Sequence, residues 1–292
     1  MNLIMPDYYA QFSCIADRCR HNCCIGWEID IDEDTLKKYS CVTGELGQRL
    51  NSNISLDGGA HFVLSNERCP FLNELGLCDI ITQIGNEYLC QICADHPRFR
   101  NFFDNRVEIG LGLCCEEAAR LILSNENKVK LNFRDFDDDF FSFRQSVFEI
   151  LQDRSVSIDE RFEKMLLICG SNEKPKAIFE WVEFFKKLER LDNSWDNLLD
   201  SIEVGVDYVP KEFDIVFEQL AVYFVYRHFS NFDASICAPF VCLSVKFIRA
   251  ICAAKFLHQK TLTILDIAEV ARMYSSEIEY SDENLDALLC TF

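Results

Sequence analysis

Cysteine is concentrated in the first 115 residues of this chain, which hold eleven of its sixteen cysteines. Eight of them form a candidate ligand set: Cys14, Cys19, Cys23, Cys24, Cys69, Cys78, Cys93 and Cys115. The first four follow the pattern C-x4-C-x3-C-C among polar and charged neighbours, which burial in a core does not explain. Thiolates at this density are typical of sites for thiophilic metals or iron–sulfur clusters. The sequence therefore predicts a metal site at these cysteines.

Core packing and disulfide bonding are the other common roles of cysteine. The five later cysteines lie in apolar helical runs and are expected to be core residues: Cys169, Cys237, Cys242, Cys252 and Cys290. Disulfides need an oxidising compartment, and the first residues show none of the features of a secretory signal. We therefore expect a cytoplasmic protein whose thiols are reduced.

The cysteine spacing favours an iron–sulfur cluster over zinc without excluding zinc. Structural zinc usually shows paired C-x2-C motifs, and the only such pair here is Cys90 and Cys93. Iron–sulfur proteins gather ligands at more varied spacings. Several arginines lie near the thiols in the sequence and can offset their negative charge: Arg18, Arg20, Arg68, Arg98, Arg100 and Arg120.

Several stretches together resemble the bacterial flagellin lysine N-methylases. They are PDYYAQFSCIADRCRHNCCIGWEIDIDEDTLKKY, CPFLNELGLCDI, the run from Cys93 through HPR to Arg98, CEEAARLIL and YSSEIEYSDENLDALL. The N-terminal part is also similar to the CxxCxxCC group of zinc- or iron-chelating domains. The resemblance implies methyl transfer from S-adenosylmethionine to lysine side chains of flagellin, with a 4Fe–4S cluster bound by the cysteine motifs.

The same eight cysteines match the pattern of this family. Cys41, Cys90 and Cys114 are extra cysteines by that pattern. Glu116 stands where the family commonly has proline, and Tyr280 where histidine is typical. These departures leave the ligand set intact but blur which member of a cysteine doublet is the ligand.

Methyl transfer to lysine requires that the ε-amine lose its proton and lie in line with the sulfonium methyl group. The residues nearest the cysteine motifs that can line a lysine channel are Tyr8, Tyr9, Asp95 and His96. We expect these four to be the catalytic residues. Arg98, at the end of the HPR run, is the predicted cofactor-binding residue.

A Rossmann-type pocket for S-adenosylmethionine is not recognisable in the sequence. The fragment GLG at residues 110–112 is the nearest match to a G-x-G loop and is better explained as turn or strand glycine. The sequence therefore predicts that donor and cluster share one unconventional pocket. One hypothesis is that an open iron chelates the amino and carboxylate groups of the donor.

The expected architecture is mainly α. Residues 1–127 form a cysteine-rich metal-binding subdomain with short β-hairpins, packed on a helical bundle of residues 128–292. In the first part we expect an amphipathic turn at the start, a strand over Glu28 to Ile31, a helix from Asp34 to Tyr39 capped by Asp32, and glycine-rich loops after it. Hairpins are expected over residues 69–80 and 99–113, turning at Gly76 and at Asp104-Asn105.

From Cys115 onward, apolar residues recur at helical spacing. Helices are predicted over residues 115–127, 141–151, 161–169, 176–191, 213–229, 240–257 and 264–278. Charged residues interrupt the longest apolar runs before 18 uninterrupted residues accumulate, so no membrane span is expected.

The chain has a formal net charge of −19, which argues against nucleic acid and anionic membranes as partners. It would attract lysine-bearing segments, and we expect flagellin and S-adenosylmethionine as partners of a monomer. Two other functions remain open at this point. One is a non-enzymatic zinc-binding structural or interaction module, and the other is an iron–sulfur electron-transfer or redox-sensing protein.

Overall fold

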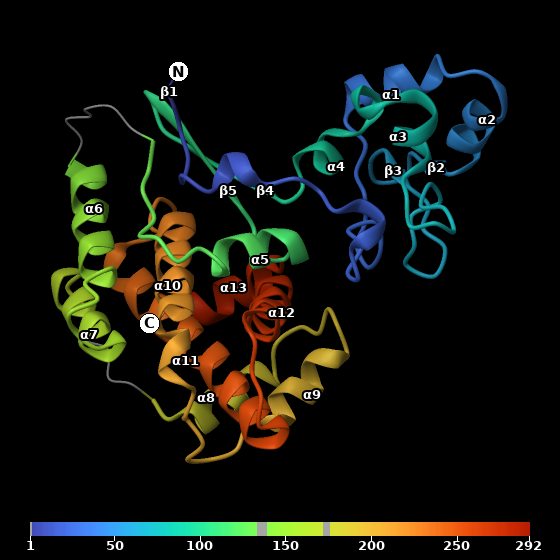
Figure 1. Ribbon diagram of the computed structural model, residues 1–292. Helices are drawn as coiled ribbons and strands as arrows, with labels where there is room; N and C mark the ends of the chain where they lie inside the picture. The colour runs from blue at the N-terminus through green and yellow to red at the C-terminus, as the bar shows by residue number, and fades with distance from the viewer. Residues whose placement is uncertain (1, 133–138, 172–175) are drawn as a thin grey trace. The chain divides into compact units, whose positions relative to one another are not determined.

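The computed structural model describes residues 2–132, 139–171 and 176–292. Contacts divide the chain into two compact units (Figure 1). Unit 1 comprises Met1–Phe12 and Phe99–Phe292, and unit 2 comprises Ser13–Arg98. These units follow contacts between residues, whereas the predicted subdomains follow the composition of the sequence. The predicted boundary at residue 127 therefore stays a prediction.

Unit 1 carries most of the helices. Its described elements are β1 (Asn2–Ile4), η1 (Tyr9–Gln11), β4 (Arg98–Phe102, starting on the last residue of unit 2), β5 (Arg106–Leu111), α5 (Glu116–Leu123), α6 (Asp139–Leu151), α7 (Ile158–Ile168), α8 (Ile178–Phe185), α9 (Ser194–Ser201), η4 (Lys211–Phe213), α10 (Asp214–His228), α11 (Ala234–Gln259), α12 (Ile264–Tyr274), η5 (Ser275–Glu279) and α13 (Asp282–Leu289). Unit 2 contains η2 (Ala16–Arg18), α1 (Glu33–Ser40), α2 (Gly44–Ser52), β2 (Ile54–Ser55), β3 (His61–Phe62), α3 (Asp79–Ile84), η3 (Asn86–Tyr88) and α4 (Gln91–Asp95).

The prediction of a mainly helical chain is confirmed for the described residues. Helices α10 and α11 form the centre of unit 1, and both are buried along most of their length. Helix α10 packs on α11, α5 and α6, while α12 packs on α11 and α5. The predicted helix over residues 176–191 is shorter in the structure, because α8 ends at Phe185.

Helix α11 is the one described helix whose length and composition would allow it to cross a membrane. In the structure, 83% of its most apolar window is buried inside the protein. Packing against α10, α12 and α13 therefore accounts for its apolar sequence. The expectation that the chain has no membrane span stays a prediction.

A small sheet in unit 1 has the strand order β1-β5-β4. The predicted hairpin that turns at Asp104-Asn105 is confirmed as β4 and β5. Residues 2–4 form β1 parallel to β5, and the turn predicted at the start of the chain follows at residues 7–11. Pairing with the free edge of β5 satisfies the backbone there and buries Ile4 in the core of unit 1.

In unit 2, the predicted helix after Asp32 is confirmed as α1, and the Asp32 carboxylate accepts a hydrogen bond from the Thr35 amide at 3.0 Å. The predicted strand from Glu28 to Ile31 is wrong, because this extended segment makes only the single bridge of Asp30 with His61. Its register is nevertheless fixed, since the amide of Ile31 bonds to the carbonyl of Ala60 at 2.7 Å.

The prediction of glycine-rich loops after α1 is wrong for Gly44 and Gly47, which lie in α2, and is confirmed for Gly58 and Gly59, which lie between β2 and β3. Glycine lowers helix propensity, but burial of Leu46 and Leu50 in the core of unit 2 outweighs that cost. Gly47 is required by packing rather than by flexibility. A Cβ atom at this position would lie 2.1 Å from the carbonyl oxygen of Val42.

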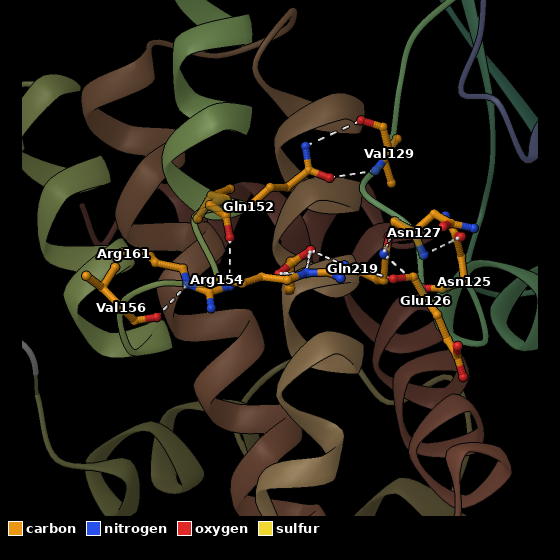
Figure 2. Close-up of polar contacts among 11 residues, drawn as sticks. Asn125, Glu126, Asn127, Val129, Gln152, Arg154, Val156, Arg161 and Gln219 are labelled. Atoms are coloured by element: carbon orange, nitrogen blue, oxygen red, sulfur yellow. Dashed lines mark hydrogen bonds and ion pairs between the residues drawn. The ribbon is translucent and has the colours of Figure 1, made fainter.

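Buried charge ties three segments of unit 1 together (Figure 2). Glu218 on α10 is fully buried. It forms ion pairs with Arg154 of the α6–α7 connection at 2.9 Å and with Arg161 of α7 at 2.8 Å. The neighbouring Gln219 donates to the carbonyls of Asn125 and Asn127. The chain after α5 is therefore fixed to the central helix.

Candidate functional site

Six cysteines of unit 2 interact with one another and are called the thiol cluster below: Cys23, Cys24, Cys69, Cys78, Cys90 and Cys93. Five of them belong to the predicted ligand set. The sixth, Cys90, is an extra cysteine by the family pattern. The signal that identifies it in the sequence is its C-x2-C spacing to Cys93.

Backbone pairing brings the first two parts of the thiol cluster together. The amide of Cys69 donates to the carbonyl of Cys24 at 2.9 Å, which joins the cysteine doublet to the start of the hairpin over residues 69–80. That hairpin turns at Gly76, whose φ of +75° suits glycine, and closes with the bridge between Leu72 and Cys78. The predicted turn at Gly76 is thereby confirmed, but the residues around it form only this single bridge, and residues 79–80 belong to α3.

Arginines hold the hairpin in place. Arg68 donates to the carbonyls of Leu72 and Asn73, the latter at 2.7 Å. Arg49 of α2 donates to the carbonyl of Pro70 and forms an ion pair with Asp79 at 2.9 Å. Cys78 is the N-cap residue of α3, and Asp79 is the first residue of that helix. These contacts fix the backbone on either side of Cys69 and Cys78.

Helix α4 supplies Cys90 and Cys93. Cys90 is its N-cap residue, and the next amide, that of Gln91, donates to Asp32 at 2.8 Å. Asp32 thus caps α1 with one carboxylate oxygen and anchors α4 with the other. The thiol cluster therefore depends on the junction between the two helix starts.

Hydrogen bonds between sulfur atoms divide the thiol cluster into donors and acceptors. Cys24 is bonded to Cys23 and Cys69, which lowers the pKa of Cys23 to about 7 and also lowers that of Cys69. The same bonds raise the pKa of Cys24, which keeps its proton. Cys90 and Cys93 form a second pair in which the pKa of Cys90 is lowered and that of Cys93 is raised. All six thiols are free of disulfides.

Soft sulfur donors fit a thiophilic metal or an iron–sulfur centre by their chemistry. The present positions are those of hydrogen-bonded thiols. Within residues 2–132, 139–171 and 176–292, no three Cys, His, Asp or Glu side chains are arranged to hold one metal ion. Donor chemistry thus fits such a centre, whereas binding would require thiol deprotonation and a shift of the sulfur atoms.

The three remaining predicted ligands have other local contacts. Cys14 accepts a hydrogen bond from the amide of Ala16, and the thiol of Cys19 donates to the carbonyl of His21 at 3.3 Å, so each is engaged with its own local turn. Cys115 belongs to unit 1, where it is the N-cap residue of α5. The role of these three as ligands stays a prediction.

Three further predicted site residues follow Cys93 in unit 2. Asp95 accepts a hydrogen bond from Gln91 at 2.6 Å, and Arg98 donates to the carbonyl of His96. The imidazole of His96 lies against the indole of Trp27, with ring centroids 5.9 Å apart. Burial, aided by the charge of Arg98, lowers the pKa of His96 to about 4, so its ring is neutral at pH 7.

Tyr8 and Tyr9 belong to unit 1. Tyr8 is buried in the core, and burial raises the pKa of its phenol, with a smaller contribution from Asp7. Tyr9 is half-buried against the same core. The catalytic roles predicted for these residues and for Asp95 and His96 stay predictions.

Unit 1 contains a buried polar network, centred on Glu279, that was not predicted from the sequence. Glu279 accepts hydrogen bonds from Tyr223 at 3.0 Å and His228 at 2.6 Å and forms an ion pair with Arg227 at 3.1 Å. The Tyr223 hydroxyl also accepts from the amide of Leu113 at 3.2 Å. The network therefore fixes the backbone immediately before the Cys114-Cys115 doublet.

Arg227 also connects this network to two aromatic rings. Its guanidinium carbon lies 5.0 Å from the ring centroid of Phe99 and 5.0 Å from that of Tyr280, whose hydroxyl is hydrogen-bonded to Cys114. Glu279 ends a π-helical turn, η5, and such turns are frequent at functional sites. The sign of this network in the sequence is the distal motif that contains Glu279. The partners of Glu279 on α10 lie more than fifty residues earlier in the sequence.

Comparison with protein families matches residues 172–292 of this chain to the FliB lysine N-methylase C-terminal domain. This segment includes α8 to α13 and therefore carries Glu279 and its partners on α10. No solved structure matches the chain.

Curated relatives point the same way. The lysine-N-methylase of Salmonella typhimurium is 30% identical over 135 residues, which cover 44% of this chain and 34% of the relative, and that of Salmonella choleraesuis matches equally. The match thus spans about a third of the length of these two relatives. The flagellar biosynthetic protein FliU of Salmonella muenchen is 30% identical over 134 residues, covering 43% of this chain and 79% of that protein.

Proposed function

This chain belongs to the flagellin lysine N-methylase family, and on that premise we propose that it transfers a methyl group from S-adenosylmethionine to lysine side chains of flagellin. The observation that carries the proposal is the match to FliU, which extends over 79% of that protein. The names of the relatives support lysine methylation, and the word flagellar in one of them is compatible with flagellin as the substrate.

The proposal includes a metal centre, a 4Fe–4S cluster, held by cysteines of the predicted ligand set. The thiol cluster supports this part, since it collects sulfur donors from the doublet, the hairpin and the start of α4. Cys14, Cys19 and Cys115 complete the proposed set. Such a cluster, when bound, would supply iron sites that can coordinate or exchange electrons.

The proposed work of the protein residues is positioning and proton transfer. A lysine amine is a nucleophile only after its proton is lost, and a desolvated channel lowers its pKa. We propose that Asp95 and His96 line this channel, because Asp95 can hold the ammonium and the neutral His96 can accept a hydrogen bond from the amine. Tyr8, Tyr9 and the cofactor-binding role of Arg98 are part of the same proposal.

The test is mass spectrometry of flagellin after incubation with the purified, iron-reconstituted protein and S-adenosylmethionine. Lysine-containing peptides are expected to gain mass in steps of one methyl group. Cys23→Ala should abolish the gain, whereas Cys41→Ala should retain it, because Cys41 is exposed in unit 2 and lies outside the thiol cluster. A colourless protein with stoichiometric zinc and no methylation would instead identify a zinc-binding module. A brown protein that does not bind the donor would identify an electron carrier.

A further inference from the structure

Tyr39 on α1 carries a buried hydroxyl group that no described residue binds. Its side chain is 1% exposed, and its hydroxyl oxygen has no hydrogen-bond partner in the described part of the chain. Leaving a buried hydroxyl group unbonded costs free energy, so such groups in folded proteins usually have a partner. This hydroxyl group is therefore available to a bound group.

Helix α1 directs this side chain into the core of unit 2. Thr35 and Tyr39 are its two buried residues, and they lie one turn apart on the same face of the helix. The ring of Tyr39 packs against that of Phe62, with ring centroids 6.0 Å apart. Cys69 and Cys90 of the thiol cluster belong to the same core. The fold thus holds the tyrosine ring and two of the cluster thiols in one packed core.

The hydroxyl group of Tyr39 also lies within the electrostatic influence of the thiol cluster. Burial raises the pKa of this phenol above its ordinary value of about 10, and the charges of four cluster cysteines raise it further: Cys90, Cys93, Cys78 and Cys69. The hydroxyl group is therefore protonated at pH 7 and can donate a hydrogen bond.

The sulfur atoms around Tyr39 become better acceptors when a metal binds. In their present positions none of them is hydrogen-bonded to this hydroxyl group. A protonated thiol is a weak acceptor, whereas a thiolate or a sulfide accepts strongly because it is charged. Binding of a thiophilic metal removes the thiol protons. An iron–sulfur centre on these cysteines would therefore supply the acceptor that the hydroxyl group lacks.

We propose that the Tyr39 hydroxyl group donates a hydrogen bond to a sulfur atom of the bound centre, an inference that rests on the cluster of the proposed function. Tyr39 is then a positioning residue, which orients a sulfur atom and offsets part of the negative charge of the centre. Hydrogen bonds to the sulfur atoms help to set the reduction potential of iron–sulfur centres. Because the reduced form is the more negative one, this hydrogen bond favours reduction.

The experiment compares the reconstituted full-length wild type with Tyr39→Phe, which removes the hydroxyl oxygen and keeps the ring that packs on Phe62. The reduction potential is measured by titration with dithionite, followed by electron paramagnetic resonance. At the midpoint potential of the wild type, the ratio of reduced to oxidised centre should be about tenfold lower in the variant, because a charged acceptor loses its donor. This ratio corresponds to a midpoint about 59 mV lower for a one-electron couple.

Two further measurements separate this role from a structural one. Iron per chain should stay near that of the wild type, because the cysteine ligands are intact. The urea midpoint of the metal-free variant should be equal to that of the wild type or slightly higher, because the hydroxyl group has no partner among the described residues. Tyr208→Phe is the matched control, since it removes the hydroxyl oxygen of an exposed tyrosine of unit 1, and it should keep the wild-type potential.

Three results would overturn the inference. An unchanged potential in Tyr39→Phe would show that the hydroxyl group does not bind the centre, while the cluster of the wild type would still stand. A lower urea midpoint of the metal-free variant would assign the hydroxyl group a structural role. Loss of iron at an unchanged urea midpoint would make the phenol oxygen a metal ligand. A wild type that takes up no iron and sulfide would refute the proposed cluster together with the inference.

Discussion

Cys69 is the residue on which the thiol cluster depends most, since it joins the hydrogen-bonded doublet to the hairpin. Replacing Cys69 with Ser is expected to remove most of the bound metal, because a hydroxyl is a poor ligand for a thiophilic ion. Metal content per protein chain, measured by inductively coupled plasma mass spectrometry, checks this. Cys41→Ser is the control, and equal metal content in both variants would show that Cys69 is not a ligand.

His228 should make the stability of unit 1 depend on pH. Burial lowers the pKa of this imidazole below its value of about 6.5 in an unfolded chain, although Glu279 opposes the shift. The unfolded state therefore binds a proton that the folded state does not, and stability is lost as the pH falls below about 6.5. The free energy of unfolding should decrease between pH 7 and pH 5.

The variant His228→Gln should show a weaker decrease over the same range, measured by urea unfolding followed through the buried Trp181 and Trp195. The exposed His258 supplies the control, because His258→Gln removes a histidine from the surface. If both variants kept the pH dependence of the wild type, His228 would not be its source.

Single residues of the site were predictable where their chemistry is local. The cysteine pattern pointed to five of the six members of the thiol cluster, because dense thiols among polar neighbours are typical of ligand sites rather than of cores. Cys90 was missed because the family pattern outweighed its spacing to Cys93. The partners of Glu279 could not be predicted, since Tyr223 and Arg227 lie on a helix whose residues are apolar or buried all round.

Among the elements, the junction of α1 and α4 is held by one side chain. Asp32→Ala removes the cap of α1 and the bond to the amide of Gln91, so it should destabilise unit 2 by about 1–2 kcal/mol. Hydrogen exchange of the amides in α1 and α4, followed by mass spectrometry, checks the prediction. Asp32→Asn should have a smaller effect, because its amide oxygen can still cap α1. Unchanged exchange in α4 would contradict the proposed link between the two helices.

The contacts of Glu218 connect α10 to α7 and to the α6–α7 connection. Glu218→Ala leaves Arg161 buried without its carboxylate, and breaking a buried ion pair in this way costs about 3–5 kcal/mol. The midpoint of urea unfolding should fall accordingly. Glu149→Ala, on the exposed face of α6, should leave it nearly unchanged. An equal midpoint for the two variants would contradict a structural role for Glu218.

Elements whose apolar residues recur at regular spacing were predicted well, whereas elements that depend on contacts with distant parts of the chain were not. Helices α5 to α8 and α10 to α12 follow the apolar spacing, whereas α9 was not predicted, and the turns at Gly76 and Asp104-Asn105 follow their turn residues. Strand β1 forms because it pairs with the edge of β5, and α2 forms because Leu46 and Leu50 are buried in the core of unit 2. Neither cause is visible in the local sequence, where glycine argues against α2.

At the scale of the whole molecule, the proposed reaction draws on residues of both units. Unit 2 carries most of the predicted cysteine ligands, and unit 1 carries Cys115, the Glu279 network and the match to the C-terminal domain of the family. The acidic balance of −19 suits a substrate segment that presents lysine. Activity would therefore require both units in one chain.

The most direct test of lysine methylation uses S-adenosylmethionine with a deuterated methyl group. Flagellin is incubated with the reconstituted full chain, digested and analysed by mass spectrometry for labelled lysine. We predict lysine residues that carry a deuterated methyl group in the wild-type reaction and none in the reaction of Cys69→Ser. Flagellin without label, from a protein that carries its metal and binds the donor, would contradict the proposed methyl transfer.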